Sequence, residues 1–314
     1  MRIARTPKKP TVFQRNIIAC LFIEISFIML SPGCAPPVLV EPIDIEYDMA
    51  AFDLNDPNAI VKGYQQVLDD YVAGSKDNRI DYKKLSGDEA ALGKLDRFLT
   101  WAGQVEIKEP DYLAGSQERL AFLINVHNAL ALSGVFQFEP FDKLSELPGD
   151  YFQIIRLKMG DEFLSLRQIS HLCGVESDWQ MAFALGGPNR SDPFIAETVY
   201  TSEKLPQQLD EAVKNYIGSC AGLRVDHARH RILLGRLLYD RVGFFTGSYY
   251  DRFNIENVSM VSALIPWAAP RTQEQLVELV GYEADRQIWD DRLNQVVEDE
   301  EEVEGIDEYI CGIK

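Results

Sequence analysis

Basic side chains are scarce in this sequence. Its 314 residues include 31 lysines and arginines against 49 aspartates and glutamates, which gives a formal net charge of −18. A nucleic-acid backbone binds to a basic face, and anionic lipid attracts basic segments. The composition therefore argues against nucleic acid as a partner and against direct adsorption to an anionic membrane surface.

Common catalytic and cofactor-binding motifs are absent as well. The sequence contains no G-x-S-x-G, H-E-x-x-H or C-x-x-C pattern, no glycine-rich phosphate-binding fingerprint and no internal repeat. Its hydrophobic content of 46% is ordinary for a globular protein. We therefore expect a folded domain without a cofactor and without a metal site, whose partner is an unknown small molecule or protein.

A short apolar run near the N-terminus follows several basic residues. The run "IIACLFIEISFIML" covers residues 17–30 and is shorter than the ~20 residues that span a bilayer. A basic segment followed by such a run is typical of a secretory signal. The pair Gly33-Cys34 that follows resembles the cleavage point of bacterial lipoproteins, in which the cysteine is lipidated.

These features predict a lipoprotein-type signal peptide over residues 1–33 and lipidation at Cys34. Ala35 in place of aspartate favours sorting to the outer membrane, so we expect an exported outer-membrane lipoprotein that faces the periplasm. Its membrane attachment is then through the N-terminal lipid only. A soluble periplasmic protein, or an uncleaved anchor, remains the alternative.

The remaining sequence divides into a tether, a domain and a tail. Residues 34–56 contain several prolines and no helical period, which favours an extended tether. Periodicity begins near residue 57 and predicts a single domain over residues 57–294. Residues 295–314 form an acidic tail, in which the stretch 298–308 carries eight acidic side chains and no basic one.

The expected domain begins with helices and continues with strands mixed with helices. Amphipathic spacing predicts helices at 57–72 and 90–103, and a nearly all-apolar stretch predicts a central buried helix at 117–138. We expect hairpins at 151–166 and 223–234, a buried strand at 179–187, a last strand near 285–294, and helices at 165–173, 202–220, 235–246, 256–265 and 272–281. The fold class is therefore α+β, with a helical N-terminal half and a small, mostly antiparallel sheet with interspersed helices.

Three polar residues lie in the central helix, in "LINVHNALAL". Asn125 and Asn128 are three positions apart and share a helical face, whereas His127 points about 100° away from Asn128. One interpretation makes the two amides ligand-binding groups and His127 a base. The other has the amides bond to neighbouring loop backbone and fix the core.

Two further places offer candidate site residues. His171 ends a short helix, where it is a cap, a base or a metal ligand. The loop "GGPNRSDPF" at 186–194 follows the expected buried strand, and loops in that position often carry sites. Its ligand-binding candidates are Asn189, Arg190 and Ser191, and Asp192 is a candidate catalytic carboxylate.

Six blocks in a fixed order resemble the DUF547 family, an uncharacterised domain family whose bacterial members are often exported. The blocks lie at 74–85, 118–132, 164–171, 181–194, 200–217 and 288–294. Asn125 and Asn128 match two asparagines of the family pattern, His127 replaces a tyrosine, and His171 matches a family histidine.

One block departs from the family pattern. In H-F-A-L-x-C-G-x-x-S-C-P, Ala182 replaces the histidine, Gly187 the first cysteine and Asp192 the second. If the family uses those groups for thiol chemistry, this chain lacks both nucleophile and base. We therefore expect a non-catalytic ligand- or protein-binding module. The alternative is a hydrolase or transferase of thiol-hydrolase-like ancestry that uses Asn125, His171 and Asp192 in a cleft.

Overall fold

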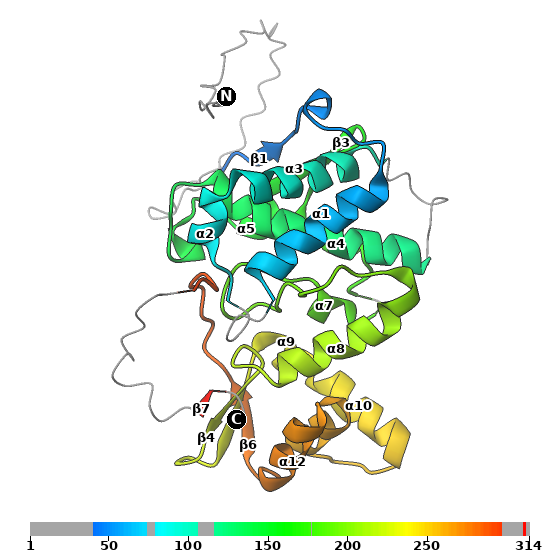
Figure 1. The fold of residues 1–314 in the computed structure, drawn as a ribbon. Coiled ribbons are helices and arrows are strands. Elements are labelled where there is room, and N and C mark those ends of the chain that lie inside the picture. The colour runs from blue at the N-terminus through cyan, green and yellow to red at the C-terminus, as the bar shows by residue number, and fades with distance from the viewer. Residues whose placement is uncertain (1–39, 74–78, 106–115, 177, 297–309, 312–314) are drawn as a thin grey trace, which may run out of the picture. The chain divides into compact units, whose positions relative to one another are not determined.

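The computed structural model describes residues 40–73, 79–105, 116–176, 178–296 and 310–311 (Figure 1). The predicted signal peptide, the lipidation site Cys34 and the acidic stretch 298–308 lie outside these residues and stay predictions. The part from Val40 onward packs as one unit.

The first half of the domain is helical, as the sequence predicts. α1 (Pro57–Tyr71) buries Ile60, Tyr64, Val67, Leu68 and Tyr71. α2 (Tyr82–Gly87) and α3 (Glu89–Gly103) follow. α1 packs against α3 through the stacked rings of Tyr64 and Phe98, whose centroids are 4.5 Å apart. The spacing of apolar residues thus predicted the buried face of α1 as well as its existence.

α4 (Gln117–Gly134) is the central buried helix (Figure 1). Ser116 begins it, since its hydroxyl accepts a hydrogen bond from the Arg119 backbone N–H. The stretch 117–137 is the one segment of the described residues that is long and apolar enough to cross a membrane, and 78% of its most apolar 18-residue window is buried inside the domain. That burial is what the core helix of a folded domain shows.

The first sheet has the order β1-β2-β3. β2 (Ile155–Met159) and β3 (Glu162–Ser165) form the predicted hairpin, preceded by the single turn α5 (Tyr151–Ile154). β1 (Ile43–Ile45) pairs in parallel with β2, although the sequence predicted a tether there. The buried side chain of Ile45 and the ion pair between Asp44 and Arg156, at 2.6 Å, attach this segment to the domain.

Residues 179–187 contradict the sequence prediction of a buried strand. They contain the helical turn α7 (Met181–Ala184), between α6 (Leu166–Leu172) and α8 (Leu205–Ile217). A short apolar run does not distinguish a strand from a buried helical turn. Here the Asn128 side chain bonds to Ala184 O and Gly186 N, so an amide replaces the partner strand that a ladder would need.

The second half contains a further sheet, in the order β6-β5-β4-β7. Its strands are β4 (Leu223–Asp226), β5 (Arg231–Leu234), β6 (Glu283–Arg286) and β7 (Ile310–Cys311). Helices α9 (Arg236–Tyr239), α10 (Val242–Phe253), α11 (Met260–Leu264) and α12 (Pro270–Glu278) accompany it. Short 3-10 turns occur at Met49–Ala51, Val135–Gln137, Leu144–Glu146, Ser202–Lys204 and Ile265–Trp267. The α+β class and the second hairpin are confirmed, with two small mixed sheets among the described residues.

Two hydrophobic cores result, and α8 belongs to both. Leu205 and Leu209 at its start pack into the first core, whereas Val213 and Tyr216 near its end pack into the second. After β6 the chain runs back from the second sheet toward the first core (Figure 1). We call residues 287–296 the return segment. It forms bridges to the first part of the domain at Gln295, Arg292 and Leu293.

Candidate functional site

Residues from both cores and from the return segment line one cavity, which we call the central cavity. Its volume is about 740 Å³, within the range of small-molecule sites. Its lining includes His127 of α4, Asp192 of the 186–194 loop, Arg241 before α10 and Trp289 of the return segment. Segments far apart in the sequence therefore supply its chemistry.

The 186–194 loop is built around Asn189. The Asn189 side-chain oxygen accepts hydrogen bonds from the backbone N–H groups of Ser191 and Asp192, at 2.8 and 3.0 Å, and its amide nitrogen donates to the Asp192 carboxylate. A Cβ atom at Gly187 would overlap that carboxylate. The glycine and the aspartate therefore depend on each other, because Asp192 occupies the space that a side chain at 187 would need.

Asp192 is a buried carboxyl group, with 7% of the residue exposed. Burial raises its pKa from 3.8 to about 7, and the hydrogen bonds from Asn189 only partly oppose this rise. Near neutral pH the group therefore exchanges between a hydrogen-bond donor and a charged acceptor. A titratable group with a strongly perturbed pKa that lines a cavity is a mark of a functional site.

His127 lines the same cavity, and its ring is within reach of Asn128 instead of turned away from it. Its Nδ1 lies 3.4 Å from Asn128 Oδ1, which already accepts a hydrogen bond from Gly186 N. A side-chain amide oxygen only accepts, so Nδ1 carries the hydrogen and Nε2 keeps its lone pair. The helical angle between neighbouring residues describes their Cβ directions, and the ring atoms lie further out, which explains the difference from the sequence expectation.

Burial lowers the pKa of His127 to about 4, so the imidazole is neutral at ordinary pH. No described residue forms a hydrogen bond with its Nε2. The lining of the central cavity therefore includes one neutral imidazole and one carboxyl group whose pKa is near 7.

The two asparagines of α4 hold backbone. Asn125 donates to Tyr200 O and accepts from Tyr200 N, both at 2.8 Å. Asn128 donates to Ala184 O at 3.0 Å and accepts from Gly186 N at 2.8 Å. These contacts are those of the second interpretation of the sequence, in which the amides fix loop backbone. Asn128 thereby positions the start of the loop that carries Asp192.

The other loop candidates face different ways. Asn189 shapes the loop from inside, and Arg190 directs its Nε to Leu293 O of the return segment at 3.3 Å. Ser191 lines the central cavity, and its hydroxyl accepts from the Asp290 backbone N–H at 2.7 Å. The return segment therefore fixes one side of the loop.

His171 does not line the central cavity. Its side chain is 54% exposed, and its Nδ1 lies 3.3 Å from Glu176 Oε1. The structure thus does not gather the predicted trio of Asn125, His171 and Asp192, since Asp192 alone of the three is among the lining residues. Among the residues that the structure describes, no group of three or more metal-binding side chains is present.

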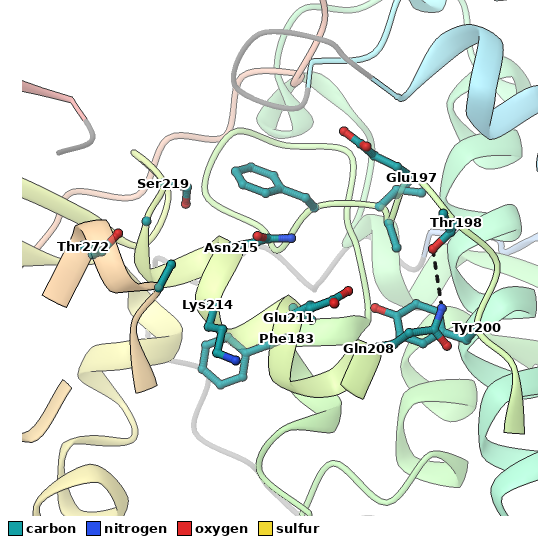
Figure 2. A pocket seen from close by; sticks show the side chains of 16 residues that line it. Phe183, Glu197, Thr198, Tyr200, Gln208, Glu211, Lys214, Asn215, Ser219 and Thr272 are labelled. Atoms are coloured by element: carbon teal, nitrogen blue, oxygen red, sulfur yellow. Dashed lines mark hydrogen bonds between the residues drawn. The ribbon is translucent and has the colours of Figure 1, made fainter. Parts of the chain in front are cut away.

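A second cavity, of about 570 Å³, lies between the 194–200 segment, α8 and the start of α12 (Figure 2). Its lining is largely polar, and two of its polar side chains bond to residues outside the lining: Lys214 pairs with Asp210 at 3.0 Å, and Gln208 donates to Val199 O at 2.9 Å. Burial raises the pKa of Tyr200 in this lining, which keeps the phenol neutral. The central cavity instead contains a carboxyl group whose pKa is near 7, so it is the better candidate site.

Sequence reasoning identified Asp192 and Ser191 and overlooked Arg241 and Trp289. No local motif surrounds the last two, and they meet the loop only through tertiary packing.

Comparison with known proteins identifies one family. The family model described as "Protein of unknown function, DUF547" matches residues 111–217. This match confirms the resemblance found in the sequence, over a shorter range than the one predicted, and it covers α4 through α8. No curated protein and no solved structure matches the chain.

Proposed function

We propose that this chain, whose residues 111–217 match the DUF547 family, is a binding protein that holds a small-molecule ligand in the central cavity and performs no chemistry on it. The observation that carries the proposal is where its departures from the family pattern lie. Ala182 and Asp192 line the central cavity, and Gly187 lies against the Asp192 carboxylate. An alanine transfers no proton, and a carboxylate does not replace a thiolate in acyl transfer.

The binding domain is proposed to be exported and anchored through lipid on Cys34, on the support of the basic and apolar N-terminal sequence alone. Palmitate labelling of the expressed full chain tests this part. We expect label on the wild type and none on Cys34→Ala, and label that persists in the variant contradicts it.

Binding in the central cavity is tested with a neutral apolar dye, N-phenyl-1-naphthylamine, whose fluorescence rises when it leaves water. We expect saturable binding of one dye per chain. Ala182→Trp fills the cavity and is expected to abolish binding, whereas Ala90→Trp, on the exposed face of α3, leaves it unchanged. No saturable binding, or equal binding by both variants, contradicts the proposal.

A second candidate function rests on the carboxyl group of Asp192, whose pKa of about 7 suits a general acid or base. In this alternative the chain is a hydrolase or transferase, as the family resemblance suggested. Turnover of p-nitrophenyl esters above the background rate, lost in Asp192→Asn while dye binding persists, favours this alternative. A rate equal to background in both proteins favours binding alone.

A further inference from the structure

We infer that the ligand of the central cavity is an apolar organic anion, a carboxylate or phosphate on a hydrophobic body, and that Arg241 binds its charged head. This inference deepens the proposed function and rests on it. It stands on the charge arrangement around the central cavity and on the position of one arginine.

Three arginines line the central cavity, and two of them have acidic partners. Arg167 pairs with Asp150 at 2.7 Å, and Arg236 pairs with Asp240 at 3.4 Å. Both pairs are solvent-exposed. Their charges are therefore satisfied before a ligand arrives.

Arg241 differs from both. It is half-buried at the residue before α10, and its guanidinium lies over the ring of Phe183, 5.8 Å from the centroid. No described residue forms an ion pair or hydrogen bond with that guanidinium. Burial lowers its pKa, which reflects the cost of removing the charge from water. The nearby charge of Asp240 offsets this cost only in part, and an anionic ligand would offset more of it.

The remaining acids of the lining have other roles. Asp291 accepts a hydrogen bond from the Ser145 backbone N–H at 3.1 Å, and Asp192 accepts from Asn189 and is partly protonated near neutral pH. Asp240, the sequence neighbour of Arg241, pairs with Arg236. None of these acidic side chains forms an ion pair with Arg241, so its guanidinium can bind a ligand. Guanidinium groups often form two parallel hydrogen bonds with a carboxylate or a phosphate.

The rest of the lining indicates the ligand's body. Phe152, Val175, Leu185, Leu237 and Trp289 supply apolar surface to the central cavity. Trp289 is 43% exposed, and the Arg236 guanidinium lies over its ring, 5.7 Å from the centroid. A ligand with a charged head at Arg241 and a hydrophobic body against these side chains fits both halves of the lining.

The test is displacement of N-phenyl-1-naphthylamine from the full chain by probes that share one body: 3-phenylpropionate, 2-phenylethyl phosphate and the neutral 3-phenylpropan-1-ol. We expect at least one anion to displace the dye at a concentration at least tenfold lower than the alcohol does. Arg241→Gln should remove that preference and leave the alcohol unchanged, and Arg241→Lys should retain part of it.

The matched control is Arg252→Gln. Like Arg241, Arg252 lies over an aromatic ring, in its case that of Phe253 with the centroid at 5.3 Å. Unlike Arg241, it is exposed and does not line the cavity. We expect this variant to keep the full preference for the anion. If Arg241→Gln does not fold, the comparison of Arg241→Lys and wild type with the three probes decides the matter.

The outcomes separate the two proposals. Dye binding that Ala182→Trp abolishes, with anions and alcohol equally effective, overturns the anionic ligand and leaves the binding function intact. A preference for the anion that persists in Arg241→Gln also overturns the inference. Dye binding that is insensitive to Ala182→Trp overturns the proposed function and the inference with it.

Discussion

Replacing Asp192 by asparagine tests the electrostatics of the central cavity without changing its shape. Asparagine has nearly the same volume, keeps an oxygen that accepts the Asn189 hydrogen bond, and never ionises. The folded protein raises the pKa of Asp192 from 3.8 to about 7 because burial disfavours the carboxylate. The folded state therefore holds this proton more tightly than the unfolded chain does.

The sign and size of the effect follow from that difference. The stability contributed by a group whose pKa rises on folding is fully present below the unfolded value of 3.8 and is lost as the pH rises through about 7. Each pKa unit corresponds to roughly 1.4 kcal/mol. Between pH 5 and pH 8.5 the wild type should lose about 2–3 kcal/mol of unfolding free energy that Asp192→Asn does not lose.

Urea denaturation at pH 5, 6, 7 and 8.5 measures this loss. The quantity to compare is the difference in unfolding free energy between Asp192→Asn and the wild type, because other titrating groups cancel in it. Asp251→Asn is the control, since Asp251 is exposed on α10. A difference that stays constant from pH 5 to pH 8.5 refutes a raised pKa at Asp192, and an equal trend for Asp251→Asn refutes its link to burial.

Three further changes have expected sizes, each measured by urea denaturation. Because burial lowers the pKa of His127 to about 4, the wild type should lose about 2–3 kcal/mol of unfolding free energy as the pH falls from 8 to 4.5, and His127→Gln should not lose it. The same pH dependence of the unfolding free energy in both proteins contradicts this prediction. Asn128→Ala should cost about 2–4 kcal/mol because Ala184 O and Gly186 N lose their partner, against about 0.5 kcal/mol or less for the exposed Asn58→Ala. Ile45→Ala should lower the unfolding free energy by about 2–4 kcal/mol if β1 belongs to the domain. An unchanged unfolding free energy would favour the tether that the sequence predicts there.

The elements that the sequence predicted correctly carry strong local signals. α1 repeats its apolar residues at helical spacing over four turns, and α4 is apolar on every side, as a central helix must be. The two hairpins have turn residues between short apolar runs, and Gly160 takes a positive φ in the first turn. These features depend on neighbours in the chain, so one sequence reveals them.

The elements that it missed depend on distant partners. β1 is three residues long and becomes a strand because β2, more than a hundred residues later, offers an edge. The 179–187 segment folds as a turn because the Asn128 amide supplies its hydrogen bonds. Periodicity contains no information about either partner, so the sequence alone predicts neither the β1–β2 pairing nor the helical turn at Met181–Ala184.

The residues of the candidate site also differ in whether a local sequence signal predicts them. Asp192 was found because loop residues after an apolar run are frequent in sites, a local rule. Arg241 has no motif around it, and its proposed role depends on its burial and on its position over the ring of Phe183. The helical angle places His127 away from Asn128, whereas the His127 ring lines the cavity and reaches Asn128.

The most direct test of a ligand site in the central cavity is an NMR titration of the four tryptophan indole N–H signals with N-phenyl-1-naphthylamine. Trp289 lines the central cavity, and Trp101, Trp179 and Trp267 do not. The Trp289→Phe variant assigns its signal. We predict a saturable shift of the Trp289 signal with the other three unchanged. A Trp289 signal that stays in place while the dye binds, or while another indole shifts, contradicts the account.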